Sequence, residues 1–325
     1  MAMRKVFKYS YGVDIGGTNT NIALVDRDGN IIDSDRVSTR LYHKVEDFVS
    51  VIAKVIAEMT ERHKVQGRVC GIGVGAPAVN VKTRCIECAS DLPWHDNIPF
   101  ARMLGSATGL PVSINNDANA AAVGEMMYGA ARGMSDFIVL TLGTGVGSGI
   151  VCDGHLIEGK NGFAGELGHV AFGWNDDRKC SCGHRGCLQT MCSSGGLVLT
   201  ARKIMESTLI PSVLRGMNDD ELTARAIGEA ASAGDNIARQ TINIAEEALG
   251  RACAEFAAFT DPEAIILFGG VARPEVWNLG HIIDVMNNNI LFLYRNKIKL
   301  LFSGLQGADA ALLGAASLPW QNRQL

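Results

Sequence analysis

The chain has 325 residues, of which 47% are hydrophobic and 20% are charged. This length suggests two domains that each bury a core, and the composition is too apolar for a disordered chain. The 30 basic and 34 acidic residues leave a net charge of −4. Proteins that bind nucleic acid need a basic surface to neutralise phosphates, so we expect no nucleic-acid partner.

The N-terminus lacks the apolar stretch of a secretory signal, and no apolar run reaches the roughly 18 residues of a membrane span. We therefore expect a cytoplasmic protein with no membrane partner. The nine cysteines are an odd number, which favours free thiols or a metal site over a disulfide framework.

In chain order, the first half alternates short strands with helices. Strand patterns occur over 8–14, 19–25, 31–38, 69–75 and 111–115. Apolar residues at helical spacing predict a helix over 44–63, and an alanine-rich helix begins near Asp117. Gly16-Gly17-Thr18 forms the first turn of this half.

The second half opens with a weak repeat of the first, because residues 141–153 resemble residues 14–26 as two strands around a glycine turn. Helices are then predicted over 193–207, 220–233, 236–260, 275–293 and 308–317, and strands over 264–268 and 297–302. This alternation predicts an α/β protein that arose from duplication of one unit.

The first glycine loop reads Asp14-Ile15-Gly16-Gly17-Thr18-Asn19. A strand delivers the Asp14 carboxylate to its end, and the two glycines let backbone N–H groups turn toward an anion. Thr18 and Thr20 would add hydroxyl donors. The loop can hold a phosphate while Asp14 organises Mg²⁺ through water; the alternative is an ordinary glycine hairpin.

A second glycine loop spans residues 141–149 and includes Thr144 and Gly145. It fits neither a dinucleotide-binding fingerprint nor a P-loop. Glycines weaken strands, but they let phosphate oxygens approach the backbone. Two such loops suggest a nucleoside triphosphate held between related domains, and Gly269-Gly270 is a candidate contact for its adenosine.

Asn115-Asn116-Asp117-Ala118-Asn119 lies where a strand gives way to a helix. Asn and Asp are good N-caps, so one reading is a capped helix. Three Asn and one Asp in five positions exceed what a cap requires. They would suit a polyhydroxylated ligand, with Asp117 as the base that removes a hydroxyl proton.

Cys180, Cys182 and Cys187 follow Glu166-Leu167-Gly168-His169. The Cys-x-Cys-x₄-Cys spacing with His169 predicts a tetrahedral Cys₃His zinc site, and His184 is an alternative fourth ligand. Four protein ligands leave no open position for water, so the zinc would be structural. It would fix the 166–169 loop.

Together these motifs resemble the ROK family of repressors and sugar kinases, in particular its bacterial glucokinases. The resemblance rests on 14–19, 116–119, 142–147, 166–169 and the three cysteines. It implies an actin/hexokinase-type ATPase fold in which two ribonuclease-H-like domains close over a cleft, often in a homodimer. We expect the domains to span 1–117 plus 307–325, and 118–306.

The resemblance also implies that Mg-ATP phosphorylates a hexose. The implied roles are the base for Asp117, sugar contacts for Asn116, Glu166, His169, Gln189 and Asp91, and ATP contacts for Asp14, Gly16, Gly17, Thr18, Asn19, Thr144, Gly145, Gly269 and Gly270. His169, Cys180, Cys182 and Cys187 would bind structural Zn²⁺. The family usually has Glu at the position of Gln189 and Asn at that of Asp91, which makes the identity of the sugar open.

Glucose is the first candidate, followed by allose, mannose, fructose or an N-acetylhexosamine such as N-acetylmannosamine or N-acetylglucosamine. A sugar-responsive repressor of the family would carry a DNA-binding domain before the first glycine loop, which here begins at Asp14. We therefore expect a kinase. A non-catalytic sugar-binding regulator is the remaining alternative, and the presence of Asp14 and Asp117 argues against it.

Overall fold

The computed structural model describes residues 6–87, 89, 92–171, 178–305 and 309–321. The chain forms two compact units. Unit 1 contains the described part of Met1–Gly133, Leu156–Ala164 and Gly304–Leu325, and unit 2 that of Met134–His155 and Gly165–Ser303. The domain bounds expected from the sequence stay a prediction. The compact units separate after Gly133, because helix α3 (Asp117–Tyr128) packs against α9 (Ala310–Gln321) inside unit 1.

Unit 1 is built on a mixed sheet with the strand order β3-β2-β1-β4-β7. The strands are β1 (Tyr9–Ile15), β2 (Asn19–Asp26), β3 (Ile31–Ser38), β4 (Val69–Gly75) and β7 (Val112–Asn115). β1 pairs antiparallel with β2 and parallel with β4, and β4 pairs parallel with β7. All five strands were predicted, whereas the small hairpin of β5 (Val79–Asn80) and β6 (Cys85–Ile86) was not.

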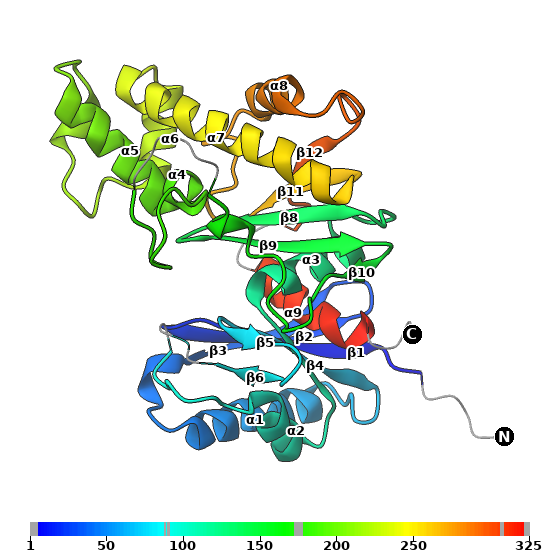
Figure 1. Ribbon diagram of the computed structural model, residues 1–325. Helices are drawn as coiled ribbons and strands as arrows, with labels where there is room; N and C mark the ends of the chain where they lie inside the picture. The colour runs from blue at the N-terminus through cyan, green and yellow to red at the C-terminus, as the bar shows by residue number, and fades with distance from the viewer. Residues whose placement is uncertain (1–5, 88, 90–91, 172–177, 306–308, 322–325) are drawn as a thin grey trace. The chain divides into compact units, whose positions relative to one another are not determined.

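Helices cover both faces of the unit 1 sheet (Figure 1). α1 (Val45–Arg62) and α2 (Phe100–Thr108) enclose an apolar core that includes the fully buried Phe48. On the other face, α9 approaches β1 and β4 closely because glycines face it. A Cβ atom on Gly73 would lie 1.8 Å from the Ala315 carbonyl oxygen.

Unit 2 contains a second mixed sheet, with the strand order β10-β9-β8-β11-β12. The strands are β8 (Phe137–Leu142), β9 (Val146–Cys152), β10 (His155–Leu156), β11 (Ala264–Phe268) and β12 (Lys299–Phe302). β8 pairs antiparallel with β9 and parallel with β11, and β11 pairs parallel with β12. The pairing repeats that of β1, β2, β4 and β7, as the weak sequence repeat predicted.

The helices of unit 2 are α4 (Gln189–Cys192), α5 (Ser194–Ser207), α6 (Ala224–Ser232), α7 (Asn236–Thr260) and α8 (Leu279–Asn289). Short 3₁₀ turns are η1 (Thr39–Leu41) in unit 1, and η2 (Leu167–His169) and η3 (Val213–Gly216) in unit 2. Two helices begin later than predicted because polar side chains cap them: Thr223 accepts an N–H at the start of α6, and Asn278 does so for α8. In unit 1, α9 continues beyond the predicted end and contains Pro319.

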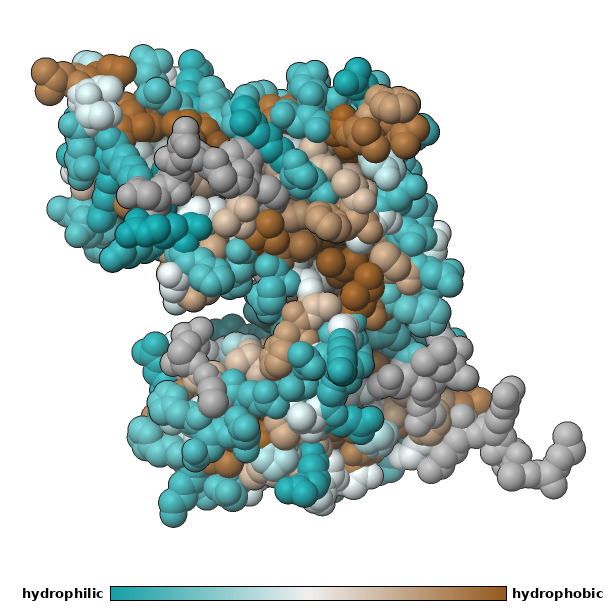
Figure 2. Space-filling view, viewed as in Figure 1, coloured by the Kyte–Doolittle hydropathy of each residue, from teal (hydrophilic) through white to brown (hydrophobic). Residues whose placement is uncertain are grey.

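The face shown in Figure 2 is largely hydrophilic, with apolar side chains gathered over the segment after α8. In that segment Leu291, Phe292 and Leu293 are each more than half exposed. Within the ranges that the structure describes, no helix is both long and apolar enough to cross a membrane. Both units combine a mixed sheet with helices, which confirms the α/β prediction.

Candidate active site and metal centre

Three parallel strands of unit 1 end at one edge of the sheet, and predicted site residues lie there. Asp14 of β1 is in register with Gly75 of β4, and Gly75 with Asn115 of β7. Neighbouring strands are about 4.8 Å apart, so Asp14 and Asn115 are separated by roughly 10 Å. In α/β sheets this carboxyl edge is where ligands bind.

Helix α3 begins directly after β7 and carries Asn116 and Asp117 in its first turn. Oδ1 of Asn116 accepts the Asn119 N–H at 2.7 Å, so Asn116 is the N-cap. Oδ1 of Asn115 accepts the N–H of Asn116 and the side-chain amide of Asn119, each at 2.9 Å. The capping role is therefore present, and this network fixes the backbone that carries Asp117.

The Asp117 carboxyl group is accessible to solvent, yet dense surrounding protein disfavours its charged form. This desolvation raises the pKa of Asp117. A hydrogen bond of 2.8 Å from the Ala118 N–H lowers the pKa but does not outweigh the desolvation. Solvent access with a raised pKa suits a general base.

Asp14 is half-buried at the end of β1. Burial raises its pKa, a hydrogen bond from the Asn21 side chain lowers it, and the negative charge of Asp117 raises it again. The two carboxyl groups are therefore near enough to interact. Asn21 in turn accepts a hydrogen bond of 2.8 Å from Nε of Arg36, which turns its amide nitrogen toward Asp14. Neither Asn21 nor Arg36 was predicted as a site residue.

The first glycine loop connects β1 to β2 in unit 1. The Gly16 N–H donates to the Asn19 carbonyl at 3.1 Å, and the Thr39 N–H donates to the Thr18 carbonyl at 2.9 Å. Thr18 and Asn19 are exposed, and Gly16 and Gly17 are half-buried. Thr20 was wrongly expected to offer its hydroxyl to a ligand, because that group is buried and lies 2.9 Å from the Thr39 hydroxyl.

The second glycine loop is the turn between β8 and β9 in unit 2. The Gly143 N–H donates to the Gly145 carbonyl at 3.0 Å, and the Gly143 carbonyl accepts the Ser194 N–H at 2.8 Å. Thr144 is exposed at the tip. We call residues 143–145 the glycine hairpin; its backbone is anchored at the start of α5.

Gly269 lies beside Leu142, directly before this hairpin, and an adenosine contact for Gly269 and Gly270 stays a prediction. Gly269 has φ of 105°, and a Cβ there would lie 2.6 Å from the Leu142 carbonyl oxygen. A cavity of about 420 Å³ next to Gly270 is also lined by Ser194, Arg273 and Glu275. Its volume is sufficient for a nucleoside.

His169, Cys180, Cys182 and Cys187 form one cluster, with all four ligand atoms within 4.8 Å of one another. The Sγ atoms of Cys182 and Cys187 are 3.6 Å apart, and Cys180 Sγ is 3.5 Å from His169 Nδ1. A tetrahedral zinc with Zn–S bonds of about 2.3 Å would place two sulfurs about 3.8 Å apart. The cluster therefore fits zinc.

The turns around the cluster explain why His169, and not His184, joins the three cysteines. Gly183 and Gly186 have φ of 91° and 71°, which lets the chain reverse between the cysteines. The His184 carbonyl accepts the Cys180 N–H at 2.8 Å, and among the described residues His184 does not belong to the cluster. His169 is thus the fourth member rather than His184.

The cysteines of the cluster differ in acidity. Burial favours the neutral thiol of Cys180, but hydrogen bonds from Cys182 and His169 outweigh it and lower the pKa of Cys180 to about 6. Burial and the neighbouring thiols raise the pKa of Cys187 to about 12. Metal ions bind thiolates, so the lowered pKa of Cys180 favours the form that ligates a metal.

The 165–169 loop carries Glu166 and His169 against the start of β9. A Cβ on Gly168 would lie 1.9 Å from the Val146 carbonyl oxygen, so only glycine fits there. Nε2 of His169 is 3.9 Å from the Glu166 carboxylate, while its Nδ1 faces Cys180. A carboxylate behind a ligating histidine orients the ring.

Gln189 lies between the metal cluster and the glycine hairpin. Its Nε2 is 3.1 Å from both Cys180 Sγ and Ser181 Oγ. Its Oε1 accepts the Val146 N–H at 3.5 Å. These contacts lie wholly within unit 2, and a sugar contact for Gln189 stays a prediction.

The predicted residues are thus gathered in two groups. Unit 1 brings together Asp14, the first glycine loop, Asn116 and Asp117, and unit 2 brings together the glycine hairpin, Gly269-Gly270, the 165–169 loop, Gln189 and the cysteines. Asp91 lies outside the described residues.

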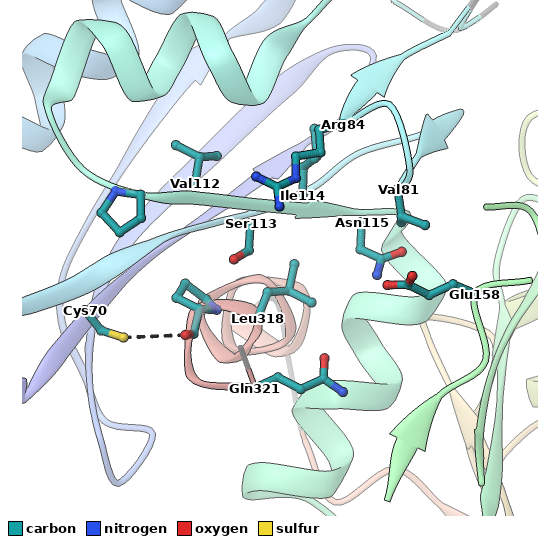
Figure 3. A pocket seen from close by; sticks show the side chains of 12 residues that line it. Cys70, Val81, Arg84, Val112, Ser113, Ile114, Asn115, Glu158, Leu318 and Gln321 are labelled. Carbon is teal, nitrogen blue, oxygen red and sulfur yellow. Dashed lines mark hydrogen bonds between the residues drawn. The ribbon is translucent and has the colours of Figure 1, made fainter. Parts of the chain in front are cut away.

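A further cavity, of about 610 Å³, follows the open edge of β7 (Figure 3). Ser113, Asn115, Arg84 and Glu158 line it. Of the Asn and Asp residues predicted to suit a polyhydroxylated ligand, it contains only Asn115, which belongs to the network that supports Asp117.

The chain matches the ROK family over residues 10–322. It is 35% identical to a glucokinase of Halalkalibacterium halodurans over 82% of this chain and 81% of that protein. It is 33% identical to a glucokinase of Thermotoga maritima over 94% and 96%, respectively. It is also 31% identical to a xylose repressor of Caldicellulosiruptor bescii, over 79% of this chain and 64% of the repressor.

Among solved structures, the chain is similar to a ROK family glucokinase from Streptomyces griseus in complex with glucose and AMPPNP. The TM-score is 0.76 at 34% identity, and the match covers 96% of this chain and 99% of that one. The two five-stranded sheets therefore form an actin-like ATPase fold.

Proposed function

This chain belongs to the ROK family, and on that premise we propose that it is an ATP-dependent hexose kinase, with glucose as the first candidate substrate. The observation that carries the proposal is the placement of Asp117 and Asp14 at one edge of the unit 1 sheet, where their carboxyl groups interact. Glucokinases at 33–35% identity support the same activity.

In the proposed reaction, Asp117 accepts the proton of a sugar hydroxyl. The freed oxygen forms a bond to the γ-phosphorus of ATP as the bond between that phosphorus and the β-γ bridging oxygen breaks, releasing ADP. Backbone N–H groups of both glycine loops position the phosphates, because phosphoryl transfer depends mainly on positioning and charge. Asp14 would hold hydrated Mg²⁺, which neutralises phosphate charge when bound.

The nucleoside of ATP would occupy the unit 2 cavity beside Gly270. Gly269 and Gly270 let the chain pass close to this ligand, and the neighbouring hairpin residues Thr144 and Gly145 would meet its phosphates. AMPPNP bound to the Streptomyces griseus glucokinase supports ATP as the donor.

The sugar would be held by Asn116, Glu166, His169, Gln189 and Asp91. Zn²⁺ in the His169 and cysteine cluster would keep the 165–169 loop in place rather than take part in the chemistry. Because Gln189 and Asp91 depart from the family pattern, the identity of the hexose is the finer part of the proposal. We also propose a homodimer, which light scattering on the purified protein would test.

The test is ADP release with Mg-ATP over a panel of glucose, mannose, fructose, allose, N-acetylglucosamine and N-acetylmannosamine. We expect turnover with at least one hexose, with glucose first, and turnover lowered about 10²–10⁴-fold for Asp117→Asn with the same sugar. Sugar binding measured by calorimetry serves as the control for folding of the variant. Absence of turnover with every sugar would contradict a hexose kinase.

A sugar-binding regulator is the second candidate, since a xylose repressor is among the relatives. It predicts hexose or pentose binding without ADP release. Asp14 and Asp117 favour the kinase, because a protein that only binds sugar needs no base beside a magnesium carboxylate.

A further inference from the structure

Gln189 joins two parts of unit 2 that have different proposed ligands. Its Nε2 is 3.1 Å from the Cys180 thiol of the metal cluster, and its Oε1 receives the Val146 N–H, directly after the glycine hairpin, at 3.5 Å. Gln189 is also the first residue of α4. One short side chain therefore spans the interval between metal cluster and hairpin.

In this chain an amide suits both contacts of residue 189. It donates through nitrogen and accepts through oxygen, so it serves the Cys180 sulfur on one side and a backbone N–H on the other. The carboxylate of Glu, usual here in the family, would still accept from Val146. A carboxylate has no hydrogen to donate to the Cys180 sulfur.

The hairpin lies close to the Gln189 amide and is anchored in unit 2. A Cβ on Gly145 would lie 3.1 Å from Oε1 of Gln189, and the Gly143 carbonyl is held by the Ser194 N–H. A displacement of Cys180 therefore changes where the amide of Gln189 lies, and the amide oxygen in turn bounds the hairpin.

We propose that Gln189 is a positioning residue that couples metal binding at the cluster to nucleotide binding at the glycine hairpin. The inference rests on the proposed function, since it takes Zn²⁺ and ATP as the two ligands. Nucleotide phosphates that order the hairpin would hold the Gln189 amide toward Cys180 and so tighten the metal site. By linkage, zinc strengthens nucleotide binding by the same factor.

The experiment measures zinc affinity by chelator competition on the full chain, with and without saturating Mg-AMPPNP. For the wild type we expect AMPPNP to tighten zinc binding about 5-fold, the low end of measured couplings between sites. Gln189→Glu keeps the side-chain size and the acceptor but lacks the donor, so zinc affinity should become independent of AMPPNP. Ser181→Ala removes only the second acceptor of the amide and should keep the wild-type ratio.

If the Glu variant holds no zinc, the same ratio of zinc affinities with and without AMPPNP is measured in Gln189→Met, which is uncharged and of similar length. A wild-type ratio in Gln189→Met, or a ratio of one in the wild type, would overturn the coupling. Failure of the proposed function looks different, because the wild type would then bind no AMPPNP in direct calorimetry.

Discussion

At the residue scale, Asp117 combines access to solvent with a raised pKa, and both properties shape its predicted pH dependence. A base works only when deprotonated, so a raised pKa moves the acidic limb of the kcat/KM profile to higher pH than an ordinary Asp, with a pKa near 3.9, would give. Asp117→Asn should lower kcat by about 10²–10⁴-fold and leave sugar affinity within about threefold. Steady-state kinetics across pH and sugar titration by calorimetry measure both.

The control is Asp28→Asn, which removes an exposed carboxylate from the turn after β2. It should leave the rate and the acidic limb unchanged. If Asp117→Asn kept full turnover, Asp117 would not be the base.

Asn21 is predicted to act on catalysis through Asp14. Its side chain lowers the pKa of Asp14 and is itself held by Arg36. Asn21→Leu should therefore raise the pKa of Asp14 further and misplace a group proposed to hold hydrated Mg²⁺. Residues that orient a metal-binding carboxylate typically account for about 10- to 100-fold in activity or metal affinity.

The measurement for Asn21→Leu is kcat/KM as a function of Mg²⁺ concentration and pH. We expect a higher Mg²⁺ concentration for half-maximal activity and an acidic limb of the pH profile displaced to higher pH. Simple loss of folding would lower activity without moving either quantity. Arg36→Ala should shift both in the same direction by less. An unchanged Mg²⁺ requirement would exclude this role for Asn21.

The part of the site that could be predicted from the sequence is the part whose residues lie at fixed, short spacing along the chain. The cysteine cluster is encoded within eight residues, from Cys180 to Cys187, and His169 completes it. Asn21 and Gln189 were not predictable as positioning groups, because their contacts depend on strand register and on side-chain direction. Thr20 shows the same limit, since its partner Thr39 belongs to a different element.

At the element scale, the same limit applies to helix ends. Amphipathic spacing located α1 to within one residue at each end. The starts of α6 and α8 were missed, because the capping side chains of Thr223 and Asn278 decide them. The packing role of the glycines on β1 and β4 could not be predicted from the sequence. The helix that requires them, α9, lies more than 200 residues away along the chain.

The packing of β4 against α9 can be tested with two glycine variants of the same strand. Gly73→Ala would place Cβ 1.8 Å from the Ala315 carbonyl oxygen, whereas Cβ in Gly75→Ala would lie 3.6 Å from the nearest atom, Cβ of Ala120. Overpacking costs about 1–3 kcal/mol, and each kcal/mol lowers Tm by about 2–4 °C in domains of 150–250 residues. Gly73→Ala should thus be clearly less stable in thermal unfolding than Gly75→Ala. Equal Tm values would show that α9 does not press on this strand.

At the scale of the whole molecule, the two units have separate apolar cores, one around Phe48 in unit 1 and one around Trp277 in unit 2. The metal cluster belongs to unit 2. Purified protein should contain about one zinc per chain. His169→Ala should lower that content, and His184→Ala should not, because the His184 side chain is not in the cluster. Elemental analysis of the two variants compares them directly.

Removal of zinc is predicted to loosen unit 2 selectively. Structural zinc contributes folding free energy to the segments that ligate it, and here those segments also pack on β9 through Gly168 and on the glycine hairpin through Gln189. In hydrogen exchange read by mass spectrometry, chelation should speed exchange in peptides from 143–148 and 165–192. Peptides of β1 and β4 should keep their wild-type rates, because their core is built without the cluster.

Gly73→Ala provides the converse perturbation and should speed exchange around β4 and α9 while leaving 165–192 unchanged. A uniform rise across both units after chelation would mean that the metal stabilises the chain as one cooperative body.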